Sequence, residues 1–394
     1  SSYEASLEIR KIALPPNHPD LAMSYDNIGS VYCKMGEYSK ALSTHERSLE
    51  IKRIALPPNH PDLAISYNNI DLEISKQILP PNHPNLAATY NNIGEVYRDM
   101  GEYSTALSSY ERSLEIKKIA LPPNHPNLAA SYNNIGNVYN NMGEYSKALS
   151  SHKRSLEIQK IALPPNHSDL AMSYNSIGNV YYNMGEYSKA LSSHERSLEI
   201  RKIALPPNHP DLAASYNNIG MMYDNMDEYS KALSSYERSL EIQKIALPPN
   251  HPDLAASYNN IGNVYYNMGE YSKALSSHER SLEIKRIALP SNHPDLAKSY
   301  EGIGLVYSDM GEYSKALSSY ERSLEIKKIT LPPNHPDLAA PYNNIGNVYE
   351  NMGEYSKALS YYEKAQTIWT KSLPSNHPHI ELVKRNIERV KKEM

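Results

Sequence analysis

Residues 125–166 read HPNLAASYNNIGNVYNNMGEYSKALSSHKRSLEIQKIALPPN, and this 42-residue unit recurs with small changes along most of the 394-residue chain. Each unit follows an asparagine and begins with His-Pro (His-Ser once), with the histidines at positions 18, 60, 83, 125, 167, 209, 251, 293, 335 and 377. Every interval is 42 residues except that from 60 to 83, which is 23. A fixed period in this range is the signature of a solenoid repeat protein. Almost every polar residue recurs once per repeat, whereas catalysis needs a unique constellation, so the sequence favours a protein-binding array.

Two apolar stripes within the unit predict two helices. The first stripe advances in steps of 3, 4 and 7, which trace one helix face, and consists of Leu128, Tyr132, Ile135, Gly136, Tyr139 and Met142. Gly143 is expected to end the first helix, because glycine adopts the left-handed conformation that a C-terminal cap needs. The second stripe runs from Tyr145 to Ile161, and Pro164–Pro165 forbids further helix. The unit therefore predicts a helix–turn–helix with both stripes facing the seam.

These residues resemble a tetratricopeptide repeat. The resemblance lies in the run A-x-S-Y-N-N-I-G-N-V-Y-x-N-M-G-E-Y-S-K-A-L-S-S-Y-E-R-S-L-E-I, and the 42-residue length, long second helix and Asn-His-Pro-Asp start are similar to the kinesin light chain subclass. Tyr132 stands where Trp is common in such repeats, and Ser155 where Ala is common; both changes are compatible in size. The resemblance implies an all-α fold, a right-handed α–α superhelical solenoid whose first helices line a concave groove.

The repeat register divides the chain into five segments. We expect a partial repeat (second helix only) at 1–17, a hairpin at 18–59, a truncated single-helix repeat at 60–82, seven consecutive hairpins over 83–376, and a C-terminal capping helix at 377–394. Because the chain starts inside a repeat, it is expected either to extend further at its N-terminus or to be an excised fragment.

The truncated repeat lacks 19 residues, and its apolar positions form one continuous stripe: Leu63, Tyr67, Ile70, Ile74 and Ile78. We therefore predict a single helix over 61–78. One helix in place of two reverses the direction in which the next hairpin starts, so we also predict a break in the solenoid near 79–83. A deletion or a mis-spliced gene model is the alternative explanation.

Composition excludes several classes of function. The chain carries 40 Lys and Arg against 44 Asp and Glu, a net charge of −4, so the basic footprint of a nucleic-acid-binding protein is absent. A mean hydropathy of −0.61 and the lack of a long apolar run exclude a membrane span. Cys33 is the only cysteine, which favours a reducing compartment and predicts a cytoplasmic protein.

No catalytic, cofactor or metal site is predicted. The sequence contains no Walker loop, GxSxG, HExxH or CxxC motif. Equivalent His-Pro histidines are separated by at least one helix spacing, roughly 8–10 Å, too far to share a zinc ion with ligands at about 2 Å. They are expected to be capping and loop residues. The charges of the second helix predict a solvated face and include Glu111, Arg112, Glu115, Lys117 and Lys118.

Two positions vary informatively between repeats. One packing position of the second helix alternates between His and Tyr, with His45, His152, His194 and His278 in four repeats and Tyr110, Tyr236, Tyr320 and Tyr362 in four others. This exchange indicates a shared flat shape with a polar tip rather than acid–base chemistry. Asp227 replaces the turn glycine, where a left-handed conformation costs a side chain roughly 1 kcal/mol, so local weakness is expected there.

The candidate binding residues lie on the first helices, off the packing stripe. They form an asparagine ladder with three apolar or aromatic positions: Asn91, Asn133, Asn137, Asn140, Asn175, Asn179, Tyr182, Asn217, Met221, Asn259, Asn263, Tyr266, Asn343 and Asn347. A carboxamide donates and accepts hydrogen bonds, so the ladder could clamp the main chain of an extended peptide. Asparagine is a poor helix former, and bonding between neighbouring repeats could equally compensate for its recurrence.

Three functional hypotheses remain open. The leading one is an interaction scaffold that is not an enzyme. Its groove is short of positive charge, with Lys34 and Arg98 nearly alone, which predicts a neutral or mildly basic peptide or protein ligand and no nucleic acid or membrane partner. The second is a C-terminal sensor or recruitment array of a larger multidomain protein. The third is self-association through the uncapped N-terminal helix, whose apolar face carries Tyr3, Leu7, Ile9 and Ile12.

Overall fold

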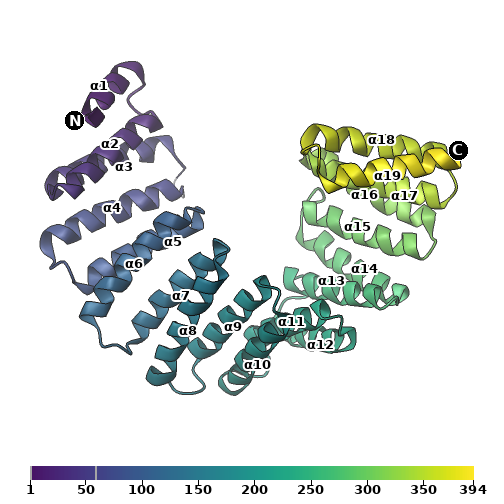
Figure 1. Ribbon diagram of the computed structural model, residues 1–394, viewed down its shortest axis with the longest axis horizontal. Coiled ribbons are helices and arrows are strands. Elements are labelled where there is room, and N and C mark those ends of the chain that lie inside the picture. Colours follow the sequence, from purple (N-terminus) through teal and green to yellow (C-terminus); the bar gives the residue numbers. More distant parts are fainter. Residues whose placement is uncertain (1, 58–59) are drawn as a thin grey trace. The chain divides into compact units, whose positions relative to one another are not determined.

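The computed structural model describes residues 2–57 and 60–394, and every regular element among them is a helix (Figure 1). The predicted all-α solenoid of stacked helices is confirmed. The chain divides into two compact units, Ser1–Ala204 and Leu205–Met394.

The first unit consists of helices that pack against their neighbours in sequence. They are α1 (Ser2–Ala13), α2 (Pro19–Lys34), α3 (Tyr38–Ala55), α4 (Pro61–Ile78), α5 (Pro84–Asp99), α6 (Tyr103–Ala120), α7 (Pro126–Asn141), α8 (Tyr145–Ala162), α9 (Ser168–Asn183) and α10 (Tyr187–Ala204).

The second unit repeats the same arrangement. Its elements are α11 (Pro210–Asn225), α12 (Tyr229–Ala246), α13 (Pro252–Asn267), α14 (Tyr271–Ala288), α15 (Pro294–Asp309), α16 (Tyr313–Thr330), η1 (Pro336–Leu338), α17 (Ala339–Asn351), α18 (Tyr355–Ser372) and α19 (Pro378–Glu393). The first helix of the last hairpin is divided into η1 and α17. Pro341 lies in the first turn of α17, and it lacks the backbone N–H that a continuous α-helix would use there.

The recurrent Asn-His-Pro element is an N-terminal helix cap. His125 has extended backbone angles (φ −71°, ψ 134°), and its Nδ1 accepts a hydrogen bond from the backbone N–H of Asn127 at 3.1 Å. Pro126 occupies the first helical position, where a missing N–H costs nothing. At the other end, Gly143 has a positive φ of 76°, as the predicted turn requires.

Within each hairpin, an aromatic ring or imidazole of the second helix packs directly against a glycine of the first helix. A Cβ on Gly136 would lie 2.7 Å from two ring atoms of His152, so no larger residue fits without a shift. In the same seam the Oγ of Ser155 donates to the buried carbonyl of Ala129 at 2.8 Å. This bond explains why serine serves where alanine is common in such repeats.

The truncated segment is one helix, α4, and the solenoid does not divide beside it. Lys52 of α3 donates to Ser66 of α4 at 3.0 Å, and Leu72 of α4 shares a core cluster with Leu86 of α5. The boundary between units lies at Ala204–Leu205 and not near 79–83. The predicted break is absent because α4 contacts both of its neighbours. It packs on α3 in the way that a first helix packs on the preceding second helix, and on α5 in the way that a second helix packs on the following first helix. The assignment of 60–82 as a truncated repeat remains our proposal.

Candidate functional site

The inner row of the asparagine ladder is engaged within the protein. Asn133 Oδ1 lies 3.0 Å from Nδ1 of His152, and Asn133 Nδ2 donates to Ser173 Oγ at 3.2 Å. Asn175 Oδ1 lies 3.1 Å from Nδ1 of His194 in the next repeat. Both carboxamides are half-buried and contact the second helix of their own repeat, and Asn133 also connects it with the first helix of the following repeat.

A second set of bonds joins consecutive first helices at a separation of 43 residues. Asn134 Nδ2 donates to Asn91 Oδ1 at 3.0 Å in the first unit, and Asn260 Nδ2 donates to Asn217 Oδ1 at 3.1 Å in the second. Further asparagine pairs are Asn183 to Asn140 at 2.9 Å and Asn386 to Asn343 at 3.2 Å. Bonding between repeats therefore compensates for the low helix propensity of these asparagines.

The outer row of candidates is more accessible. Asn179 and Asn263 are exposed, and Asn137 and Asn347 are half-buried. Asn259 belongs to the inner row, at the repeat position of Asn133, and is half-buried. Met221 is half-buried and packs against the core cluster of α12–α13. The sequence thus grouped residues that the structure places at two depths.

The two tyrosines of the set are ordered by neighbours. The Tyr182 ring lies 5.8 Å from that of Tyr187, and the Tyr266 ring lies 5.7 Å from that of Tyr271. The hydroxyl of Tyr266 donates to Asp309 Oδ2 at 2.6 Å. Burial first, and this hydrogen bond second, raise the pKa of Tyr266 to about 12, so the phenol is neutral at physiological pH.

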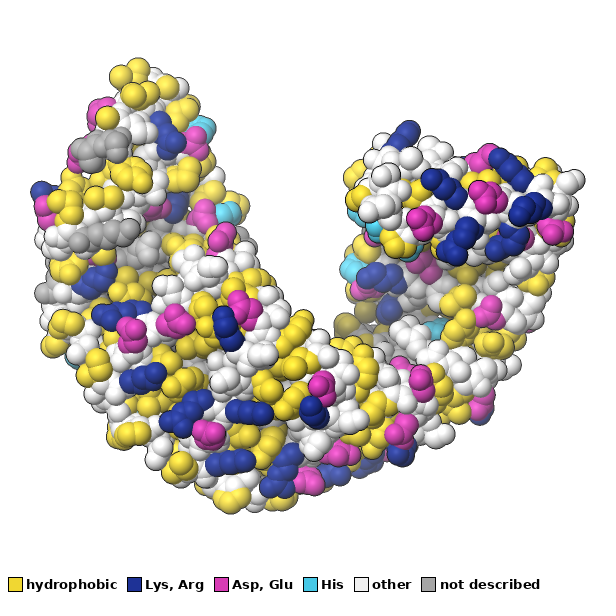
Figure 2. All heavy atoms as spheres, in the orientation of Figure 1, with side chains coloured by type: hydrophobic (Ala, Val, Ile, Leu, Met, Phe, Trp, Pro, Cys, Tyr) yellow, Lys and Arg dark blue, Asp and Glu magenta, His cyan; other side chains and the backbone are white. Residues whose placement is uncertain are grey.

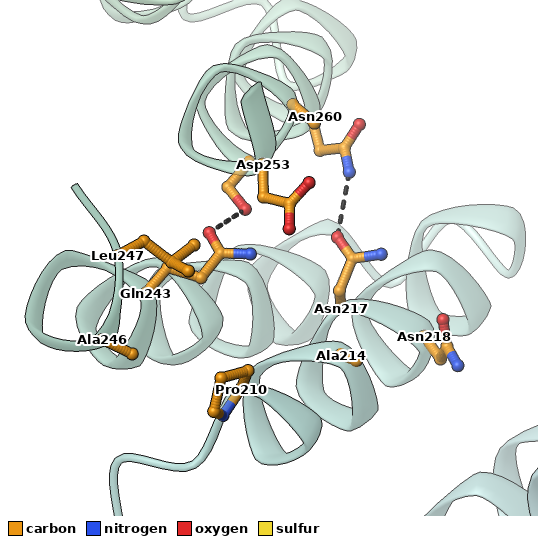
Figure 3. Close-up of a pocket in the computed structure, with 11 residues that line it drawn as sticks. Pro210, Ala214, Asn217, Asn218, Gln243, Ala246, Leu247, Asp253 and Asn260 are labelled. Carbon is orange, nitrogen blue, oxygen red and sulfur yellow. Dashed lines mark hydrogen bonds between the residues drawn. The ribbon is translucent and has the colours of Figure 1, made fainter. Parts of the chain in front are cut away.

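A crevice recurs between the N-terminal halves of consecutive first helices. In the second unit it measures about 230 Å³ and is lined by Ala214 and Asn217 of α11, Gln243 and Leu247 at the end of α12, and Asp253 and Asn260 of α13. Figure 3 shows two hydrogen bonds across it: Gln243 Oε1 accepts from Ser257 Oγ at 2.7 Å, and Asn217 Oδ1 accepts from Asn260 Nδ2 at 3.1 Å. The walls combine carboxamides with apolar methyl groups.

Equivalent crevices occur elsewhere, with a different residue on the floor. Lys117 replaces Gln243 in a crevice of about 510 Å³ between α5 and α7. Trp369 replaces it in one of about 400 Å³ between α17 and α19. The Trp369 ring stacks on that of His379, with centroids 5.0 Å apart.

The residues on the floor of these crevices are not among the candidates that the sequence pattern indicates. Lys117 was expected on a solvated face, but it is half-buried in the crevice. Burial lowers its pKa, against a smaller opposite effect of Glu95. One position of the second helices holds Lys, Gln, Arg or Trp in different repeats, and a purely solvated position gives no reason for a tryptophan.

The remaining charges of the second helices do lie at the surface. Figure 2 shows Lys and Arg side chains interspersed with Asp and Glu over α6, α8 and α10. Ion pairs three residues apart account for part of this pattern, such as Arg112 with Glu115 and Arg154 with Glu157, both at 2.9 Å. Among residues 2–57 and 60–394, no group of three or more His, Cys, Asp or Glu could hold a metal ion, and no helix is long and apolar enough to cross a membrane.

Comparison with known families gives matches along most of the chain. A tetratricopeptide repeat model matches residues 1–54, 61–119, 169–245 and 253–329, and two further models of the same description match 128–169 and 339–369. No curated protein gives a significant match to the sequence.

Solved structures similar to this chain include proteins with tetratricopeptide repeats. A signal transduction ATPase with numerous domains (STAND) and a tetratricopeptide repeat sensor, from Pyrococcus horikoshii, is 15% identical with a TM-score of 0.63, over 97% of this chain and 56% of that one. BtubC (BKLC) from P. vanneervenii is 22% identical with a TM-score of 0.50, over 60% and 92%. The nearly identical repeats of a protein assigned as a kinesin light chain in Podosopora anserina are 23% identical with a TM-score of 0.48, over 52% and 97%. At these identities the likeness concerns the fold alone.

Proposed function

The chain belongs to the tetratricopeptide repeat family, and from this premise we propose that it is a non-catalytic scaffold for protein–protein interaction. Its ligand is an extended peptide or a partner surface that lies along the first helices. The main support for this proposal is the recurring crevice between consecutive first helices. In each unit it is lined by asparagine side chains next to alanine and leucine residues. An extended chain presents polar main chain and side chains at a regular spacing that suits such a series.

The proposed contact residues divide by depth. The engaged carboxamides of Asn91, Asn133, Asn175 and Asn217 hold the helices in register. The exposed carboxamides of Asn179 and Asn263 donate and accept bonds to the ligand main chain. Tyr182 and Tyr266 serve as anchors, because aromatic side chains ordered by a neighbouring ring lose little entropy on binding.

We propose a ligand that is neutral or mildly basic overall. The chain has a net charge of −4, and acidic side chains end several first helices, including Asp224, Asp309 and Glu350. Few ion pairs then form on binding, so affinity should depend weakly on salt.

The test compares two variants in binding short random peptides that are acetylated and amidated. Asn179→Ala with Asn263→Ala should weaken binding by roughly tenfold, the loss of one or two hydrogen bonds, with helicity and melting unchanged. Asn133→Ala with Asn175→Ala should lower the melting temperature, because it leaves two buried histidines without partners. Unchanged binding by the exposed pair in a folded protein would contradict the proposed ligand contacts.

A second candidate is a recruitment or sensor array within a larger protein. The array in the Pyrococcus horikoshii STAND protein is described as a sensor, and this chain spans 56% of that protein. A third candidate, self-association, is supported by the exposure of Ile9 and Ile12 on α1, at 68% and 90%. Light scattering over a concentration series separates it from the scaffold, since a mass that stays monomeric contradicts it.

A further inference from the structure

Helix α4 stands in the place of a whole hairpin. The chain turns at 79–83 directly into α5, the first helix of the next hairpin (Figure 1). The contacts that α4 makes with α3 and with α5 are both of the kind that regular repeats make with their neighbours. We therefore expect α4 to expose the face with which a regular first helix packs on its own second helix.

The exposed residues of α4 lie on this hairpin face. Ala129 and Gly136 of α7 are buried against α8. Counted from the capping histidine, their counterparts in α4 are Ala64 and Asp71, and both are exposed. Three large side chains of α4 are also exposed, at 52%, 41% and 72%: Tyr67, Ile74 and Ile78. Steps of 3 and 4 place all five residues on one face of the helix.

Helix α3 extends the same surface. In regular repeats a leucine of one second helix packs with an isoleucine of the next second helix, as Leu114 does with Ile158 in a shared core cluster. Leu114 is 6% exposed, whereas Leu49, its counterpart in α3, is only half-buried. A cavity of about 340 Å³ on α3 is lined by Leu49 and four other residues: Glu46, Glu50, Arg53 and Ile54. We call Leu49 and the five exposed residues of α4 the α3–α4 surface.

The regular repeats indicate what fits this surface, because a second helix packs at the equivalent place in each of them. The fit differs at one point, since Asp71 stands at the position of Gly136. A Cβ on Gly136 would lie 2.7 Å from the ring of His152, so an aspartate there excludes a ring at the same distance. A long basic side chain, in contrast, pairs its cationic end with the carboxylate.

The charges around the surface also favour a basic occupant. Thr89 Oγ1 of α5 donates to Asp71 Oδ2 at 2.7 Å, which orients the carboxylate. Two further carboxylates, those of Glu46 and Glu50, line the α3 cavity together with Arg53. Three acids thus stand against one base at the edge of an apolar stripe.

We propose that the α3–α4 surface is a docking site for one amphipathic helix of a partner protein, with an aliphatic stripe and a Lys or Arg opposite Asp71. The docked helix takes the place of the second helix of a regular hairpin. None of the residues of this surface lines the crevices between first helices described above. The inference therefore goes beyond the proposed peptide binding and does not depend on it.

The probe is a labelled synthetic peptide with the sequence of α8, residues 145–162, acetylated and amidated. One form keeps His152, and the other carries His152→Lys. The full chain should bind the lysine form about tenfold more tightly than the histidine form in fluorescence anisotropy, the difference that one charge-assisted hydrogen bond provides. Isolated helices of this length are marginally stable, so circular dichroism should show helix formation on binding.

Two variants of the chain assign the binding to the α3–α4 surface. Ala64→Arg places a long side chain at an exposed position, so it should leave the melting temperature unchanged and weaken binding of the lysine form by about tenfold or more. Asp71→Gly restores the glycine of a regular seam and should reverse the preference, so that the histidine form binds more tightly. Ala162→Arg is the matched control, since Ala162 is an exposed alanine at the end of α8, and it should bind as the native chain does.

The proposal is overturned if the native chain does not bind the lysine form, or if a folded Ala64→Arg variant binds it as the native chain does. Equal affinities of the two peptide forms would contradict the basic residue opposite Asp71. If the chain alone forms dimers in sedimentation equilibrium and Ala64→Arg dissociates them, the occupant is a second copy and the partner helix is wrong. Each of these results leaves the proposed binding of extended peptides standing.

Discussion

At the scale of single residues, the alternation of His and Tyr in the seam determines whether the buried ring can become charged at acidic pH. Both rings fill the space left by the glycine of the first helix, as the contacts of His152 with Gly136 and of Tyr110 with Gly94 show. Burial lowers the pKa of His152, His194 and His278 to about 4. Tyrosine carries no charge at acidic pH, so at this seam position the acid-sensitive side chains are His152, His194 and His278.

This difference predicts acid sensitivity with a defined sign. The folded histidines bind a proton less readily than unfolded ones of pKa about 6.5, so their stabilising effect is complete above pH 6.5 and is lost as the pH falls toward 4. Replacing His152, His194 and His278 by Tyr should reduce the decrease in the free energy of unfolding at acidic pH. For each histidine this decrease amounts to at most about 3 kcal/mol. Urea unfolding at neutral and acidic pH measures it, and an equal acid loss in the triple variant would contradict the argument.

Asp227 provides a second test at this scale. Its φ is +58°, the one positive value of a non-glycine residue among those described, and equivalent glycines such as Gly185 have a φ of 74°. Asp227→Gly should stabilise the protein by about 1 kcal/mol, less the loss of the hydrogen bond that Tyr229 donates to Asp227 at 2.8 Å. Gly269→Asp in the neighbouring repeat is the reverse control and should lower the melting temperature.

At the scale of elements, helix α4 shows what sequence patterns predict well and what they miss. The apolar stripe predicts one helix over 61–78, and α4 has these bounds, because helix limits depend on local capping and proline signals. The stacking of α3, α4 and α5 depends on which face of α4 contacts each neighbour. The number of helices in a repeat does not determine these faces. The Lys117 crevice was missed for the same reason, since it forms only where three helices meet.

The dual role of α4 places a carboxylate in the core. Counting from the capping histidine, Glu73 falls at the position that Val138 fills in a regular first helix, and it is only 2% exposed. Lys76 pairs with it at 3.0 Å and also contacts Cys33 Sγ at 2.8 Å, while Glu73 Oε2 has no hydrogen-bond partner among the described residues. Burial, and then Glu73, raise the pKa of Cys33.

We therefore expect opposite effects from two variants of α4. Lys76→Asn alone leaves Glu73 buried without its partner and should destabilise the protein by roughly 3 kcal/mol. Glu73→Val with Lys76→Asn restores the regular first-helix residues and should be more stable than the native chain by about 1–3 kcal/mol. Thermal and urea unfolding compare them, and a double variant less stable than the native chain would show that the buried Glu73–Lys76 pair stabilises the core.

At the scale of the whole molecule, each repeat contacts mainly its neighbours in sequence, so unfolding need not be a single event. Arrays of this kind behave as a sum of repeat stabilities and interface contributions. Trp369 is the only tryptophan in the chain and lies in the core cluster with Ile380 and Val383 of α19. Its fluorescence therefore reports the last repeat, whereas circular dichroism reports all helices.

The two probes should disagree, and mutations at opposite ends should separate them further. Val383→Ala removes buried methyl groups beneath Trp369 and should lower the fluorescence transition by the equivalent of about 1–2 kcal/mol. Gly94→Ala forces the ring of Tyr110 out of its site, 2.9 Å from the added Cβ, and should shift the dichroism transition while leaving the fluorescence transition almost unchanged. If both probes coincide and both variants move them together, the chain unfolds as one cooperative block. The coupling between repeats would then exceed the stability of each repeat, and a ligand bound at one crevice would stabilise the whole array.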